Sequence, residues 1–256
     1  MNNPIALIPA RGNSKRITKK NIKPFPFGGP PLIAYTISAA IQSGLFGENI
    51  YVSSDDSETL SIAREYGAKC ILRPKEYAAD NSVDYDWVRH ALDEIFLVEN
   101  WKPEIFFLLR PTNPLRTADT IKRAWEKFKR VPNADSLRAV ELIKQHPGKM
   151  WSQCGNLMYP YNYSAFSNGG WIHDYTGLQS YDRGTQFINE KVFVQNGSMH
   201  ICKTGVLPIY HNITGQNIVP FFTEGREGYD LNSPDDWMLL EVLYHNGLIT
   251  LPEVQK

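Results

Sequence analysis

A run of cationic residues follows the first apolar segment of the chain and is the clearest candidate for chemistry. Residues 5–9 read IALIP, and residues 11–21 read RGNSKRITKKN. The Arg11 guanidinium can hold two phosphate oxygens at once, whereas Lys15 and Lys20 act as point charges. The pattern predicts a loop that binds one small anion, such as a triphosphate. Its alternative is a solvated basic loop, because most Lys and Arg side chains are exposed.

Small residues open this loop. Gly12, Asn13 and Ser14 tolerate the backbone conformations that turn N–H groups toward an anion. The loop has neither the GxxxxGK[ST] pattern of a Walker A loop nor the GxGxxG pattern of a dinucleotide turn. Ser14 lacks the GxSxG context of a hydrolase nucleophile, and the 6 histidines show no HExxH spacing. The anion would therefore be held by cationic side chains and backbone N–H groups.

The composition limits the partners of the chain. Lys+Arg and Asp+Glu both number 27, so the formal net charge is zero. Binders of nucleic acid or of membrane surfaces depend on excess positive charge, so neither partner is expected. The chain shows no signal-peptide pattern and no apolar run of membrane-spanning length. Cys70, Cys154 and Cys202 lie far apart without CxxC pairing, so we expect a cytoplasmic protein with reduced thiols and no cysteine-based metal site.

Strand-like and helix-like segments alternate through the first half of the chain. The expected strands include residues 5–10, 49–55 and 134–142, and the expected helices include residues 31–44 and 56–67. This order predicts an α/β fold, a three-layer Rossmann-like arrangement whose mainly parallel sheet is covered by helices on both faces. The cationic loop would then lie at the carboxyl end of the first strand, where such sheets bind ligands.

The character of the sequence changes near Gln145. Residues 152–191 are rich in Tyr, Asn, Ser and Gly, and a structureless span of that length is unusual inside a compact domain. We expect a single domain over residues 1–256 with an inserted lobe at about 152–191, which serves as a substrate lid or a dimer contact. Its aromatic residues either reach a partner subunit or fill a small local core: Tyr159, Tyr161, Tyr163, Phe166 and Trp171. Strand character resumes in residues 191–202, and a capped helix is expected over residues 233–247.

Several motifs taken together resemble one enzyme family. The segments IPARGNSKRITKKNI, YVSSDD, ILRPKEYAAD, LLRPTNPLRT, VQNGSMHI and GYDLNSPDD look like the ordered motifs of the acylneuraminate cytidylyltransferase family. The resemblance spans about the whole chain and is weakest over residues 152–191. It implies a nucleotidyltransferase fold and CTP-dependent activation of a nonulosonic, sialic-acid-like sugar to its CMP-sugar, with release of pyrophosphate. It also implies a homodimer whose small-molecule partners are CTP and the sugar.

The resemblance assigns the nucleotide contacts to the cationic loop and to two later positions. Lys20 falls where the family neutralises charge at the α-phosphate, and Arg11 and Asp230 complete the expected catalytic set. The wider nucleotide-binding set is Arg11, Gly12, Asn13, Ser14, Lys15, Lys20, Asn21, Arg73 and Asp84. For Arg73 a salt bridge at the strand end is the alternative role, and Asp84 replaces a small polar residue of the relatives.

The resemblance also assigns sugar contacts. Arg110 stands where sialic acid enzymes commonly have Gln, so we expect it to hold an anion such as the sugar carboxylate. Arg116 is expected to order the turn, and Lys149 is either a ligand contact or a surface residue. The expected sugar-binding set is Arg110, Thr112, Arg183, Gln186 and Asn196.

A divalent cation, Mg²⁺, is expected to bridge the phosphates. Mg²⁺ prefers carboxylate oxygens and water, and the family supplies two aspartates in a DxD pattern. This chain reads YDLNSPDD, so Asp230 fits the first position and Asn232 takes the second. Asn keeps a carbonyl oxygen but loses a charge, so Asn232 is expected to be the weaker or water-mediated partner. Asp235 and Asp236 are expected to cap the last helix.

Two other functions fit the same residues. Within the same class, the chain would be a 3-deoxy-octulosonate cytidylyltransferase, although NSKRITKKN and LRPTNPLR resemble the sialic acid branch more. From another class, it would be a non-catalytic nucleotide-binding relative, an idea that the departures at Arg110 and Asn232 keep open.

Overall fold

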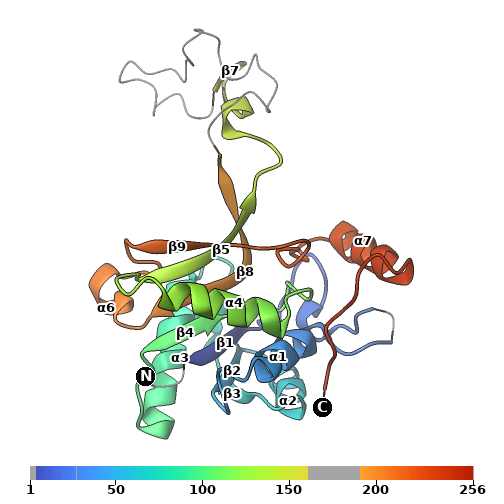
Figure 1. Ribbon diagram of the computed structural model, residues 1–256. Coiled ribbons are helices and arrows are strands. Elements are labelled where there is room, and N and C mark those ends of the chain that lie inside the picture. The colour runs from blue at the N-terminus through green and yellow to red at the C-terminus, as the bar shows by residue number, and fades with distance from the viewer. Residues whose placement is uncertain (1–3, 27, 161–190, 256) are drawn as a thin grey trace. The chain divides into compact units, whose positions relative to one another are not determined.

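The chain folds into two compact units. The structure is a computed structural model that describes residues 4–26, 28–160 and 191–255. Unit 1 combines Met1–Val140 with Asn196–Lys256, and unit 2 is Glu141–Gln195. Unit 1 contains the large sheet and the helices labelled α1 to α4, α6 and α7 in Figure 1.

A seven-stranded sheet forms the centre of unit 1, in the order β3-β2-β1-β4-β8-β5-β9. Its strands are β1 (Ile5–Pro9), β2 (Ile50–Ser54), β3 (Lys69–Leu72), β4 (Ile105–Leu108), β5 (Ser136–Leu142), β8 (Phe193–Lys203) and β9 (Ile218–Phe222). β1 pairs in parallel with β2 and β4, β2 with β3, and β5 with β9, whereas β8 is antiparallel to β4. The predicted α/β class and mainly parallel sheet are confirmed. The antiparallel direction of β8 and the strand β9 go beyond that prediction.

Helices cover both faces of the sheet, as expected. α1 (Leu32–Ser43), α2 (Ser57–Glu65) and α4 (Ala118–Lys129) share one apolar core with it. α3 (Asp84–Glu99) and α6 (Val206–Tyr210) share a second core with the opposite face. Short 3₁₀ helices, η1 (Lys20–Ile22) and η2 (Lys75–Ala78), lie in two connections, and α7 (Pro234–His245) follows β9. Within the described ranges, no helix has the length and apolar character that a membrane crossing requires.

Strand β1 shows why this sheet is buried on both sides. Ile5 and Leu7 belong to the core with α3 and α6, whereas Ala6 and Ile8 belong to the core with α1, α2 and α4. All four residues are fully buried, because successive side chains of a strand point to opposite faces. A continuous apolar run is therefore what a central strand between two helical layers requires. The cationic loop begins directly after Ala10, which is also buried.

A third apolar cluster joins the cationic loop to α7. Ile17 of the loop packs in one cluster with Phe25, Leu231 and Trp237. The rings of Phe25 and Trp237 meet edge to face, with centroids 4.9 Å apart. The cluster therefore holds two segments that are far apart in sequence against the same body.

α7 begins at a capping box. The Ser233 hydroxyl accepts a hydrogen bond from the Asp236 N–H, and the Asp236 carboxylate accepts one from the Ser233 N–H. Both aspartates expected to cap the last helix, Asp235 and Asp236, lie in its first turn, and Asp236 makes the capping contact. This cap fixes the C-terminal end of the segment that carries Asp230 and Asn232.

Unit 2 contains η3 (Pro147–Lys149) and an antiparallel hairpin of β6 (Trp151–Cys154) and β7 (Leu157–Pro160). Lys149 is the last residue of η3. Residues 161–190 lie outside the described residues, so the lobe expected at about 152–191, with its role as a lid or dimer contact, stays a prediction.

Candidate active site

The cavity of interest lies where two central strands end. In the sheet, β1 lies between β2 and β4. The chain continues from β1 to β2 and β3 on one side, and only then to β4 on the other side of β1. In such sheets this reversal of strand order opens a crevice at the carboxyl ends of the strands. Pro9 at the end of β1 and Arg110 just after β4 both line a cavity of about 380 Å³. That volume is within the range of small-molecule sites.

The cationic loop supplies one wall of this cavity. Five of its predicted residues line the cavity: Arg11, Ser14, Lys15, Lys20 and Asn21. The Asn21 amide donates a 3.0 Å hydrogen bond to the Arg11 carbonyl, which fixes the turn of the loop. Gly12 and Asn13 are not among the lining residues. The Gly12 N–H donates to Asp55 Oδ1 at 2.9 Å, and a Cβ on Gly12 would come within 2.5 Å of the Asp56 Cβ.

Lys20 crosses from the cationic loop to the segment that carries Asp230. Its ammonium group donates a 2.7 Å hydrogen bond to the Leu231 carbonyl oxygen. Burial lowers the pKa of Lys20, and the Asp230 carboxylate opposes that shift. Lys20 is thus a partly desolvated cation in the wall of the cavity, which is where a cation stabilises developing negative charge most strongly.

Asp230 and Asn232 form an oxygen-rich corner beside Lys20. The Asn232 amide donates a 2.5 Å hydrogen bond to Asp230 Oδ2. Asp230 Oδ1 is buried and has no hydrogen-bond partner within the described residues. The side-chain oxygen of Asn232, Oδ1, accepts a long 3.4 Å hydrogen bond from the Arg16 guanidinium. Arg16 lines the cavity too, although none of the sequence motifs assigns it a separate role.

This corner fits a hard divalent cation. The buried Asp230 Oδ1 is an acceptor that lacks a donor, and Asn232 Oδ1 is a second oxygen on the same turn. Mg²⁺ is usually held by one or two such oxygens together with phosphates and water. The described residues contain no cluster of three or more His, Cys, Asp or Glu side chains that would form an all-protein metal cage. The donor set therefore suits an ion that the nucleotide would bring with it.

Arg110 and Asp84 form an ion pair inside the cavity. The Arg110 guanidinium donates to Asp84 Oδ2, and the Trp87 indole N–H donates to Asp84 Oδ1 at 2.9 Å. Arg110, Asp84 and Trp87 all line the cavity. An anionic ligand at Arg110 would therefore compete with the Asp84 carboxylate.

Arg73 lines the cavity from a buried position. Its side chain donates to the Ser53 hydroxyl at 3.0 Å and to the Ser53 carbonyl at 2.9 Å, and it lies 4.6 Å from the Trp87 ring centre. Burial lowers the pKa of Arg73 to about 10. The sequence left a salt bridge at the strand end as the alternative role of Arg73. Within the described residues, Arg73 instead makes hydrogen bonds to Ser53 there. Arg73 thus supports the wall that Trp87 forms.

The turn after β4 is held by buried polar residues. Thr112 lines the cavity, and its carbonyl accepts a 2.8 Å hydrogen bond from the Leu231 N–H. Arg116 is 1% exposed and donates to the Ser198 carbonyl, to the Thr36 hydroxyl and to the Arg110 carbonyl. Burial lowers the pKa of Arg116 to about 9. The expectation that Arg116 orders the turn agrees with these contacts.

Strand β8 passes this turn at an Asn-Gly pair. Gly197 has a φ of +72°, and a Cβ on it would lie 3.7 Å from Arg110 Cδ and 3.8 Å from Asp230 Oδ2. These are ordinary van der Waals distances, so it is the left-handed backbone conformation that favours glycine here. The neighbouring Asn196, predicted to contact the sugar, is not among the lining residues and donates to the Thr223 hydroxyl at 2.8 Å.

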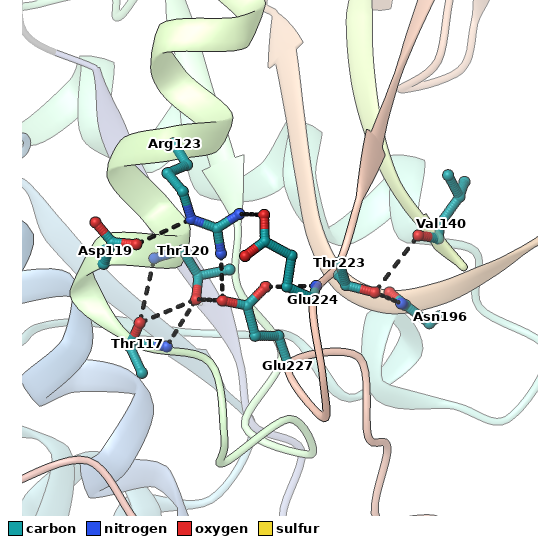
Figure 2. A network of polar contacts seen from close by, with 9 residues as sticks. All are labelled: Thr117, Asp119, Thr120, Arg123, Val140, Asn196, Thr223, Glu224 and Glu227. Carbon is teal, nitrogen blue, oxygen red and sulfur yellow. Dashed lines mark hydrogen bonds and ion pairs between the residues drawn. The ribbon is translucent and has the colours of Figure 1, made fainter. Parts of the chain in front are cut away.

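The segment that leads to Asp230 is clamped to α4. Figure 2 shows the Glu227 carboxylate between the Arg123 guanidinium and the Thr120 hydroxyl, which donates at 2.7 Å. Arg123 also pairs with Glu224 at 3.0 Å and with Asp119 at 2.9 Å (Figure 2). Further along, the Asn113 amide donates to the Tyr229 carbonyl at 3.1 Å. Asp230 therefore follows a segment that is fixed at several points.

The structure brings together most of the predicted site residues that it describes. Outside the cationic loop, the predicted residues that line the cavity are Arg73, Asp84, Arg110, Thr112, Asp230 and Asn232. Arg183 and Gln186 lie outside the described residues. The functional roles of Arg183 and Gln186 stay predictions, as do the functional roles of the predicted residues that line the cavity.

The comparisons with known proteins agree on one family. A family model described as cytidylyltransferase matches residues 5–157. The pseudaminic acid cytidylyltransferase of Campylobacter jejuni is 42% identical over 125 residues, which are 48% of this chain and 52% of that protein. The match thus spans about half the length of this relative. The CMP-N,N'-diacetyllegionaminic acid synthase of Legionella pneumophila is 31% identical over 250 residues, which cover 93% of this chain and 95% of that protein.

A solved structure shares the fold. It is a CMP:2-keto-3-deoxy-manno-octonic acid synthetase complexed with CTP, and it aligns with a TM-score of 0.64 over 95% of this chain and 99% of its own. Its sequence is 15% identical, so this likeness concerns the fold alone.

Proposed function

The chain belongs to the cytidylyltransferase family, and we propose that it transfers CMP from CTP to a nonulosonic sugar. In this reaction the anomeric hydroxyl of the sugar attacks the α-phosphorus of CTP. The bond from the α-phosphorus to the oxygen that bridges it to the β-phosphorus breaks, and pyrophosphate leaves with the bonding electrons. The hydroxyl proton passes to water. The names of the pseudaminic and legionaminic acid enzymes support this class of sugar.

One observation carries the proposal. The Lys20 ammonium spans from the cationic loop to the Leu231 carbonyl, next to Asp230, so both ends of the sequence contribute to one cavity. Phosphoryl transfer of this kind asks the protein mainly for positioning and for charge stabilisation. Lys20 and Arg11 act on the α-phosphate and on the leaving pyrophosphate, and Ser14, Lys15 and Asn21 hold the rest of the triphosphate.

Mg²⁺ is the proposed metal. Asp230 and Asn232 would hold it through their side-chain oxygens, and the rest of its shell would come from the phosphates and water. When bound, Mg²⁺ supplies positive charge that offsets the charge of the triphosphate. The buried Asp230 Oδ1 supports this role, because a buried acceptor without a donor is costly unless something binds it.

The sugar is proposed to contact Arg110 and Thr112. The Arg110 guanidinium suits a carboxylate, which it can bind at two points. In the structure Asp84 holds that guanidinium. We infer that the carboxylate of the nonulosonic sugar takes over from Asp84 when it binds. Arg183, Gln186 and Asn196 complete the proposed sugar contacts.

The proposed setting is a homodimer in the cytoplasm. Cys70 and Cys202 are both free thiols, which suits a reducing compartment. Light scattering after size-exclusion chromatography measures the mass of the particle directly. A mass of one chain at micromolar concentration would contradict the homodimer.

The activity is tested by pyrophosphate release from CTP with Mg²⁺ and a panel of nonulosonic acids. We expect release with at least one of the sialic, pseudaminic and legionaminic acids and formation of the matching CMP-sugar. Release with 3-deoxy-octulosonate alone would assign the chain to the octulosonate enzymes. CTP binding without release with any sugar would make it a non-catalytic nucleotide-binding relative.

A further inference from the structure

The Asp80 carboxylate bridges two cations of the predicted triphosphate loop. Asp80 follows η2, and its Oδ1 accepts from the Arg11 guanidinium at 3.0 Å. Its Oδ2 pairs with the Lys15 ammonium. The hydrogen bond from Lys15 lowers the pKa of Asp80, so this carboxyl group is ionised at neutral pH.

The two cations hold Asp80 as they would hold an oxyanion of a ligand. Arg11 and Lys15 both line the cavity, whereas Asp80 is not among the lining residues. A guanidinium and an ammonium that each take one oxygen are also a common arrangement for a phosphate group. The carboxylate and a triphosphate would therefore compete for the same donors.

We propose that Asp80 is an internal counter-ion that the triphosphate of CTP displaces from Arg11 and Lys15, so that Asp80 sets the affinity for the nucleotide. This inference rests on the proposed function. CTP must break the two ion pairs of Asp80 in order to bind. Removal of the Asp80 charge therefore strengthens the binding of CTP. Both pairs are exposed, with 52% of the Asp80 side chain accessible, and such pairs contribute modestly. The expected gain in affinity is therefore about three- to ten-fold.

The test measures dissociation constants by calorimetry at fixed ionic strength for wild type, Asp80→Asn and Glu76→Gln. The ligands are CTP, pyrophosphate and cytidine. Glu76 is an exposed acid of η2, so its variant removes the same charge from the same segment. We expect Asp80→Asn to bind CTP and pyrophosphate about three- to ten-fold more tightly and cytidine unchanged, with Glu76→Gln near wild type. The gain should shrink as salt rises, because salt screens exposed pairs.

The outcomes separate this inference from the proposed function. If neither wild type nor either variant binds CTP, the proposed function is wrong. If wild type binds CTP but Asp80→Asn binds it equally or more weakly, Asp80 orients the two cations and the displacement idea is wrong. A gain shared by Glu76→Gln would also overturn the inference, because it would reflect general charge. Loss of packing does not raise affinity, so tighter binding of CTP and pyrophosphate by Asp80→Asn cannot be explained by a structural role.

Discussion

The Lys20 ammonium donates a 2.7 Å hydrogen bond to the carbonyl oxygen of Leu231, which is 211 positions later in the chain. This contact joins the cationic loop after β1 to the turn that carries Asp230. The loop alone would be a basic surface turn, and the later turn alone would be a helix cap. Their meeting makes a cavity with cationic and oxygen-donor walls.

Replacing Lys20 separates catalysis from stability. We expect Lys20→Met to lower kcat/KM by about 10²- to 10³-fold, because a preorganised charge at the α-phosphate is lost. Relief of the buried charge of Lys20 offsets the loss of its hydrogen bond to Leu231, so the melting temperature should change little. Lys19→Met is the matched control, since Lys19 is an exposed neighbour that pairs with Glu58 and is not among the lining residues. Near-normal turnover of Lys20→Met would remove Lys20 from the mechanism.

Asn232 offers a test of the metal corner. Asn232→Asp replaces the amide that donates to Asp230 with a second carboxylate. Without metal the two like charges repel each other, and the free energy of unfolding should fall by about 1 kcal/mol. With Mg²⁺ the added charge strengthens binding, so half-maximal activity should need roughly three- to ten-fold less Mg²⁺.

The control for this variant is Asn246→Asp, the same chemical change at the far end of α7. Activity is titrated with Mg²⁺ at fixed CTP, and melting is followed with and without the ion. An unchanged Mg²⁺ requirement in Asn232→Asp would count against the corner as the metal site.

The clamp on α4 is expected to position Asp230 from a distance. Glu227→Gln weakens the contacts of Glu227 with Arg123 and Thr120, which costs about 1–3 kcal/mol of stability. The turn with Asp230 becomes looser, so the KM for CTP with Mg²⁺ should rise several-fold. Asp119→Asn is the control, because Asp119 binds the same guanidinium but is 74% exposed and lies on α4. Equal KM values for the two variants would mean that the clamp only stabilises the fold.

Acid should destabilise the protein through His200. Burial holds the pKa of His200 well below its usual 6.5, and the positive charges of Arg138 and Arg110 add to that shift. Below pH 6.5 His200 is protonated in the unfolded chain but stays neutral in the folded state. The free energy of unfolding therefore falls as the pH drops below 6.5. The slope from this one group is at most about 1.4 kcal/mol per pH unit.

His200→Leu removes the titrating group and keeps the site apolar. We expect its melting temperature to fall less between pH 6.5 and pH 5 than that of wild type. The exposed His245→Leu serves as the control and should keep the wild-type slope. Parallel pH profiles for His200→Leu and wild type would contradict this origin of the acid sensitivity.

Local patterns were sufficient to predict the parts of the fold that depend on neighbouring residues. The apolar run of β1, the proline-led α1 and the capped α7 are each encoded within a dozen positions. Strand order is different, because it depends on which distant edges meet. The insertion of β8 between β4 and β5, antiparallel to β4, has no local signal in its sequence.

The candidate site shows the same division. Residue types and the order of the motifs pointed to Lys20 and Asp230, which the structure brings to one cavity. The partners of these side chains were not predictable, because they come from remote segments. Asp80 lies 69 positions from Arg11, and the pairing of Arg110 with Asp84 depends on the way α3 packs on the sheet.

Gly197 brings backbone without a side chain close to Arg110 and Asp230, two residues that line the cavity. A side chain there meets a backbone penalty from the left-handed φ of +72°, although its Cβ would make only ordinary van der Waals contacts with Arg110 and Asp230. Strand β8 therefore approaches Arg110 and Asp230 at a position whose backbone conformation favours glycine. If the chain binds a sugar as proposed, a change of sugar preference would have to arise at the lining residues and leave this glycine in place.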